Sequence, residues 1–372
     1  MLNLSEYRHN ADRLADHLPW AILAAPGVVL NKDGSFQRTL RFRGPDLESA
    51  TEAELVGACA RLNNVLRRFG SGWVLFFEAE RFEAPGYPNS DFPDAASWLV
   101  DEERRAGFES GVDPLLAHGR RPHFESAYHL TLLYMPPPDQ VARAEQALLE
   151  RAEPEKGRDW CQELDAFIAE TERVRDLLTG FMPEVEALDD AGTLTYLHNT
   201  ISTRRHAVAV PETPLYLDAI LADTPLSGGI EPMLGEQHLR SVTVLGFPGM
   251  TRPGILDALN HQDFAYRWMT RFIALDKTEA TRTLTRLRRQ WFNKRKSITA
   301  LMREVMYNQP AQLTDSDADN KMVDADQALQ ALGGDHVAFG YLTATITVMD
   351  EDRLRAEEKL SLIHISEPTR PY

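Results

Sequence analysis

The sequence predicts an α+β protein of two lobes, each a largely antiparallel sheet backed by helices. The first observation is that short apolar segments with a period of two alternate with longer segments of helical periodicity. The second is that each half of the chain runs strand, helix, strand, followed by a longer helical segment and a returning strand. That order favours antiparallel or mixed sheets with helices packed against them.

The 372 residues suffice for about two domains of ordinary size. We expect the first lobe over residues 1–205 and the second, which carries a long basic helix, over residues 238–359. Residues 206–237 are taken as the connection, because proline and glycine are concentrated there.

Composition limits the class of protein. An apolar content of 43% with 26% charged residues is that of a soluble globular protein, and the net charge of -16 argues against a general nucleic-acid binder. Cys59 and Cys161 lie among apolar residues of expected helices, which predicts buried free thiols in a reducing compartment. The sequence shows neither a signal peptide nor an apolar run of membrane-spanning length. We therefore expect a cytoplasmic protein, with peripheral membrane association left open.

The elements of the first half follow from local patterns. Residues 28–30 and 36–42 flank a glycine-containing loop and predict a β-hairpin. Thr51 and Glu54 form a capping box at the start of a helix. The continuous apolar run 73–77 predicts a strand covered on both faces. Further on, the sequence predicts a helix around residue 101, an alternating strand over 128–134, two helices up to residue 178 and a helix over 193–203.

In the second half, we expect a strand over 239–245 and a short helix over 254–259. Residues 264–272 predict a strand with Phe264, Tyr266, Trp268 and Phe272 on one face and Arg267 and Arg271 on the other. Asp276 and Glu279 then begin the long basic helix. A polar loop over 314–320, a helix over 322–332 and a last strand over 339–349 complete the expected elements.

The basic helix is the most specific physical feature, and it carries no catalytic chemistry. Its apolar residues recur at helical spacing, and basic residues lie between them. A solvated helix face is the favoured interpretation, docking against an acidic surface is the second, and DNA contact would have to overcome the negative net charge. The candidate partner-contact face consists of Arg282, Arg286, Arg288, Arg289, Lys294, Arg295 and Lys296.

No catalytic, nucleotide-binding or metal-binding residue is assigned from the sequence. It contains no G-x-x-x-x-G-K-[ST] loop, no H-E-x-x-H and no cluster of cysteine and histidine. His198 and His206 flank Arg204-Arg205 and follow Asp189-Asp190, so an acid/base or phosphoryl site could be drawn from them. The favoured interpretation is an acidic pair at a helix N-terminus followed by a polar loop. His129 is interpreted as a hydrogen-bonded sheet residue rather than a ligand.

Several segments together resemble the N-terminal region of the TrbE/CagE/VirB family of conjugal transfer and type IV secretion ATPases. The resemblance runs in order from the start of the chain to about Lys359. It is carried by 25-APGVVLNKDGSFQRT-39, 97-SWLVDEERR-105, 128-YHLTLLY-134, 193-TLTYLH-198 and 287-LRRQWF-292.

The resemblance implies an ATPase that energises DNA or protein transfer, working as an oligomer on the cytoplasmic face of the inner membrane. ATP and Mg would bind a C-terminal motor domain that this chain does not reach, so no cofactor is expected here. The covered region would contact other channel components. Residues 360–372 look like a translated sequencing adapter, which we expect to be an artefact that truncates the chain. Two alternatives stay open, a stand-alone interaction or nucleic-acid-binding module using helix 282–296 and a self-contained enzyme using His198 and His206.

Overall fold

The computed structural model describes residues 13–45, 49–84, 86–87, 92, 94–110, 123–136, 160–246, 254, 256–295 and 316–366. Its strands are β1 (Trp20–Ala25), β2 (Val28–Asn31), β3 (Phe36–Arg43), β4 (Trp73–Glu83), β5 (Phe124–Tyr134), β6 (Glu184–Ala187), β7 (Leu226–Ser227), β8 (Met233–Leu234), β9 (Gln237–Thr243), β10 (Tyr266–Ala274) and β11 (Gly340–Asp350). Its helices are α1 (Leu14–His17), α2 (Glu52–Leu66), α3 (Ala95–Ser110), α5 (Trp160–Thr179), α6 (Asp190–Ile201), α7 (Leu217–Leu221), the 3₁₀ helix η2 (Asp257–His261), α8 (Lys277–Arg295), α10 (Ser316–Gly333) and α11 (Arg353–Ser366).

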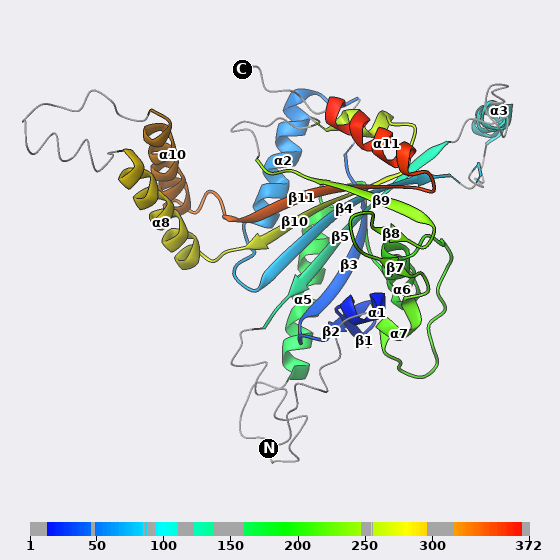
Figure 1. Ribbon diagram of the computed structural model, residues 1–372, viewed down its shortest axis with the longest axis horizontal. Helices are drawn as coiled ribbons and strands as arrows, with labels where there is room; N and C mark the ends of the chain where they lie inside the picture. Colours follow the sequence, from blue (N-terminus) through cyan, green and yellow to red (C-terminus); the bar gives the residue numbers. More distant parts are fainter. Residues whose placement is uncertain are drawn as a thin grey trace, which may run out of the picture.

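These strands form one antiparallel sheet in the order β1-β2-β3-β5-β4-β10-β11-β9-β8-β7, with β6 paired to β3 (Figure 1). The α+β class and the largely antiparallel sheet are confirmed. The sequence predicts a sheet in each half, and the structure joins the strands of both halves side by side. The join is the pairing of β4 with β10, which runs from Tyr266 opposite Arg81 to Ile273 opposite Val74.

Helices cover both faces of the sheet. On one face, α2 and α5 pack Val65, Phe69, Val174 and Leu178 against Leu75 and its neighbours in β3 and β5. Helix α11 covers β10 and β11 on the same face, because Tyr266 and Ile346 pack with its Ile363. Helix α6 lies on the opposite face, where Tyr196 reaches Glu78 of β4.

Local patterns set most element positions correctly. The hairpin of β2 and β3 forms as expected, with Val28 opposite Arg38. Thr51 and Glu54 make the reciprocal capping box at the start of α2. Strand β1, which pairs with β2, is an element that the sequence did not predict.

Several expectations were wrong. Cys59 and Cys161 are exposed, because the apolar stripes of their helices leave these positions pointing outward. The expected polar loop over 314–320 gives way to α10, which already begins at Ser316.

The structure also bears on two predicted boundaries. The expected connection contains α7, whose Leu217 and Leu221 are buried against Trp20. Helix α11 passes through the boundary at residue 360 and continues to Ser366, with Ile363 only 2% exposed. The adapter origin of residues 360–372 stays a prediction.

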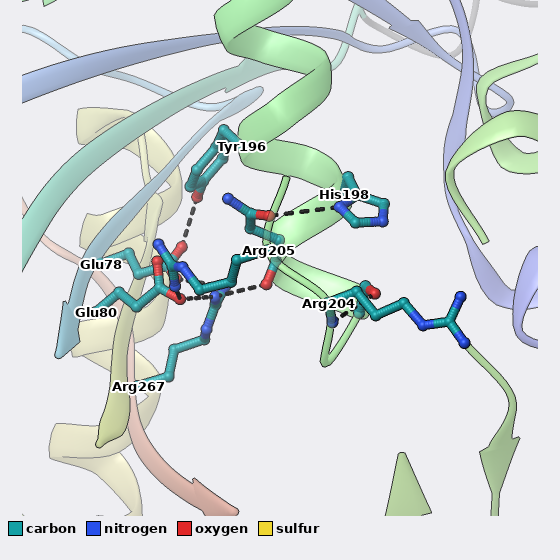
Figure 2. Close-up of polar contacts among 9 residues, drawn as sticks. Glu78, Glu80, Tyr196, His198, Arg204, Arg205 and Arg267 are labelled. Atoms are coloured by element: carbon teal, nitrogen blue, oxygen red, sulfur yellow. Dashed lines mark hydrogen bonds and ion pairs between the residues drawn. The ribbon is translucent and has the colours of Figure 1, made fainter. Parts of the chain in front are cut away.

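Arg267 is buried at the join of the two halves (Figure 2). Its Nη1 lies 2.6 Å from Glu78 Oε1, and its Nη2 lies 2.6 Å from Glu80 Oε1. The first contact is not aligned as a hydrogen bond and acts through charge, whereas Nη2 donates to Glu80 and also to the carbonyl of Asn199 at 2.8 Å. The sequence placed Arg267 on the other face of a half-buried strand, and α6 covers that face here.

Two further side chains complete this group, which we call the β4–β10 charge cluster (Glu78, Glu80, Tyr196, Arg205 and Arg267). The Tyr196 hydroxyl donates to Glu78 Oε2 at 2.6 Å. Arg205 pairs with Glu80 and covers the ring of Phe82 at 4.1 Å. Burial raises the pKa of Glu78, and the charge of Arg267 and the hydroxyl of Tyr196 counteract that rise.

The cluster predicts a large effect on stability when its one buried cation is removed. Arg267→Ala leaves Glu78 and Glu80 without their shared counter-ion, and breaking a buried pair in this way costs about 3–5 kcal/mol. Urea unfolding followed by circular dichroism measures the loss. The matched control is Arg41→Ala, whose pair with Glu186 is exposed and contributes less than about 1 kcal/mol. Equal losses in the two variants would contradict a special role for Arg267.

Candidate functional site

The predicted basic helix is α8, which lies beside α10 in a pair that projects from the end of the sheet (Figure 1). Asp276 Oδ1 accepts a hydrogen bond from the Glu279 backbone at 2.7 Å, so the expected helix start is confirmed. Ser71 fixes this start to the beginning of β4, because its hydroxyl accepts from the Asp276 backbone and donates to Glu279. At the base of the pair, Ala280 and Leu332 are buried together.

The basic residues of α8 divide into two groups. Arg282, Arg286 and Arg289 are exposed, form no ion pair with any side chain that the structure describes, and lie four and three residues apart on one stripe. Arg288 instead pairs with Asp326 of α10 at 3.0 Å. The acidic complement expected for this helix is therefore supplied in part by the chain itself.

The remaining predicted residues lie further along the helix. Lys294 and Arg295 belong to α8, but their side chains lie outside the described part of the chain, and Lys296 lies wholly outside it. Exposed apolar side chains accompany the stripe, since Leu287 is 41% and Phe292 57% exposed. Guanidinium groups beside apolar surface suit the recognition of carboxylate or phosphate groups, because the planar fork binds two oxygens at once.

The acidic pair of the sequence analysis has a structural role. Asp189 caps α6 by accepting from the Gly192 backbone at 2.7 Å. Asp190 accepts from the Gly27 backbone at 2.7 Å. Gly27 has φ +67°, and a Cβ there would meet the Leu188 carbonyl oxygen at 2.1 Å, so only glycine fits this approach. The interpretation as an acidic pair at a helix N-terminus is confirmed.

The two histidines of that pattern do come together, and they meet a different carboxylate. The rings of His198 and His206 are 4.3 Å apart between centroids. His198 Nε2 lies 3.1 Å from Asp223 Oδ2. One ligand atom from each of these three residues lies within 4.8 Å of the other two. Asp223 follows α7 within the proline-rich connection, so no local spacing in the sequence could have joined it to the histidines.

The electrostatics of this His198–His206–Asp223 group depend on its hydrogen bonds. Although partial burial raises the pKa of Asp223, hydrogen bonds from His198, Ser202 and Thr224 outweigh it and lower that pKa to about 2. His198 is only 2% exposed, whereas His206 and Asp223 face solvent. The group therefore presents a fixed carboxylate and two imidazoles at the protein surface.

His129 is buried on β5, with its ring 4.4 Å from that of Tyr196. The sequence predicts a hydrogen-bonded sheet residue, but Nδ1 of His129 has no hydrogen-bond partner in the described part of the chain. Burial lowers the pKa of His129 to about 4; Glu80 opposes this shift, and the charge of Arg267 adds to it. His129 therefore stays neutral at neutral pH.

Comparison with known proteins identifies the family. Residues 27–142, which include β2, β3, β4 and β5, match the family model described as "Type IV secretion system ATPase VirB4/TrbE, N-terminal domain". The chain is also 39% identical over 158 residues to a probable conjugal transfer protein TrbE of Sinorhizobium fredii, covering the whole of that relative. The chain belongs to the VirB4/TrbE family.

Longer VirB4/TrbE relatives match nearly all of the chain. It is 31% identical to "Conjugal transfer protein TrbE" of Rhizobium radiobacter over 98% of its length, and 23% identical to "Type IV secretion system protein virB4" of Brucella suis over 92%. The chain spans 44% and 40% of the lengths of these two relatives. Within the described ranges, no helix of this VirB4/TrbE chain combines the length and the apolar character that crossing a membrane requires.

His129 gives this VirB4/TrbE chain a predicted pH dependence of stability. Its folded pKa of about 4 lies below the ordinary value of 6.5, so its contribution is fully present above pH 6.5 and is lost as the pH falls towards 4. A shift of this size corresponds to about 3 kcal/mol. Urea unfolding between pH 7 and 4 measures it, and His129→Gln should flatten the curve in this window.

The control for His129 is His261→Gln, because the side chain of His261 is 65% exposed. This variant should keep the pH dependence of the unsubstituted protein. Parallel curves for His129→Gln and the unsubstituted protein would show that another group governs the dependence.

Proposed function

We propose that this chain is the N-terminal assembly and interaction domain of a conjugal transfer, or type IV secretion, ATPase that energises the translocation of DNA or protein. It contacts other channel components and does not itself bind nucleotide. In the whole protein, ATP and Mg bind a C-terminal motor domain. That protein works as a homo-oligomer at the cytoplasmic face of the inner membrane.

Family membership supports the setting of this proposal. Residues 27–142 match a model for the N-terminal domain of secretion ATPases, and the two long relatives are named for conjugal transfer and type IV secretion. The sequence contains no phosphate-binding loop of the G-x-x-x-x-G-K-[ST] kind. We therefore assign the chain a role in contacts rather than in catalysis.

The observation that carries the contact role is the arginine stripe of α8, formed by Arg282, Arg286 and Arg289. The stripe lies on a helical pair outside the body of the sheet, and its charges have no partner among the described side chains (Figure 1). In a chain of net charge -16, such a local basic surface suits an acidic surface of another protein. DNA is the alternative ligand, favoured by the exposed ring of Phe292 beside the arginines and opposed by the overall charge.

Charge reversal of the stripe in the full-length protein tests this role. We expect Arg282→Glu, Arg286→Glu and Arg289→Glu together to lower the transfer frequency of a mating assay at least tenfold, because the acidic partner is now repelled. ATP hydrolysis by the full-length protein and its level in the cell should not change. The control is Arg61→Glu, an exposed arginine of α2. Unchanged transfer by the triple variant would refute the contact role.

Direct binding separates a protein partner from DNA. The chain should show no salt-dependent binding to a labelled DNA duplex at low ionic strength. Duplex binding that disappears in the triple variant would favour the nucleic-acid alternative instead.

The absence of catalysis is a separate prediction. The purified chain of residues 1–372 should release no phosphate from ATP above the background of a heat-inactivated sample. Turnover that His206→Ala or Asp223→Asn abolished would instead support the self-contained enzyme that the sequence left open.

A further inference from the structure

The His198–His206–Asp223 group combines donors from three separate parts of the chain. His198 lies in the last turn of α6, His206 follows in the segment after this helix, and Asp223 comes just after α7. Tyr196 and His198 are two residues apart and therefore leave α6 on nearly opposite sides. Figure 2 shows Tyr196 directed towards Glu78 and His198 directed away from it. The histidine side of α6 is thus separate from the β4–β10 charge cluster.

The donor set and the distances fit a transition-metal ion. Two imidazole nitrogens and one carboxylate oxygen lie within 4.8 Å of one another. A tetrahedral Zn²⁺ ion with bonds of about 2.0–2.1 Å needs its ligand atoms about 3.4 Å apart. The separation of 3.1 Å between His198 Nε2 and Asp223 Oδ2 already meets this requirement, and rotation of the exposed His206 ring can bring in the third donor.

We propose that His198, His206 and Asp223 bind a divalent transition-metal cation of the zinc class, with a water molecule as the fourth ligand. Imidazole and carboxylate ligands together suit zinc in preference to Mg²⁺ or Ca²⁺, which take mostly oxygen ligands. This site is independent of the contact role assigned to α8.

The surroundings of Asp223 hold it in the orientation that a ligand needs. Thr224 donates to Asp223 Oδ1 at 2.9 Å, which leaves Oδ2 facing His198. Ser202 and Thr224 also bond to each other at 2.9 Å, so the carboxylate is fixed from the α6 side as well. Hydrogen bonds of this kind orient metal ligands and raise metal affinity.

A hydrogen bond between His198 and Asp223 is the competing interpretation. In that case a proton on Nε2 of His198 lies where the cation would bind. His206 distinguishes the two, because a simple histidine–aspartate pair needs no third donor. The ring of His206 lies against that of His198, and it forms no hydrogen bond with another residue in the described part of the chain.

A cation at this site would connect the end of α6 to the segment after α7. The connection that leaves α6 would then be held at both ends, and closing such a loop lowers the entropy of the unfolded chain. Arg205, the neighbour of His206, binds Glu80, so the same segment is anchored on its other side by the charge cluster.

Metal content and cobalt spectroscopy test the proposal. The purified chain, dialysed against Zn²⁺ and then against metal-free buffer, should retain one equivalent, measured by plasma mass spectrometry. Co²⁺ should give the intense visible absorption of a tetrahedral site. His206→Ala and Asp223→Asn should each weaken binding at least tenfold, and Zn²⁺ should raise the melting temperature of the unsubstituted chain only. His206 is exposed, so its replacement should leave the fold intact, as circular dichroism checks.

The matched control is His261→Ala, which removes an exposed histidine paired with Asp257 at 3.6 Å but lacking a third donor. It should retain Zn²⁺ as the unsubstituted chain does. Loss of all Zn²⁺ from the unsubstituted chain on dialysis, or equal retention by a His198→Ala, His206→Ala and Asp223→Asn triple variant, would overturn the proposal.

Discussion

The pairing of Arg267 with Glu78 and Glu80 is the constraint on which the two halves of this molecule depend. A guanidinium group covered by α6 cannot keep its water, so both carboxylates must lie beside it. They can do so only if β10 lies next to β4 in the observed register, with Arg267 opposite Glu80. The bond from Arg267 to the Asn199 carbonyl then fixes the end of α6 over the same join.

The position of the histidine group follows from this arrangement. His198 precedes Asn199, so the contact that fixes the end of α6 also fixes the imidazole on its other side. Arg205 and His206 are neighbours in sequence and serve different groups, the first binding Glu80 and the second meeting His198. One short segment therefore couples the buried join of the sheet to a group at the surface.

The α8–α10 pair follows a different physical logic. It touches the body of the sheet only at its base, where Ala280 and Leu332 are buried, and its exposed arginines face away from α10. A surface of this kind adds little to the stability of the fold. It is free to vary with the partner that it meets, which is the behaviour expected of a contact element on a rigid scaffold.

The sequence by itself determined the class of the fold, most helices and strands, the capping of α2 and α8, and the family resemblance, because alternation, periodicity and capping act over a few residues. Only the tertiary structure decided that the two halves share one sheet, that Arg267 is buried, that the cysteines are exposed and that Asp223 joins the two histidines. These features depend on which strands become neighbours and which helix covers them. Arg267 and Glu80 are 187 residues apart in sequence, and a local pattern carries no information over that separation.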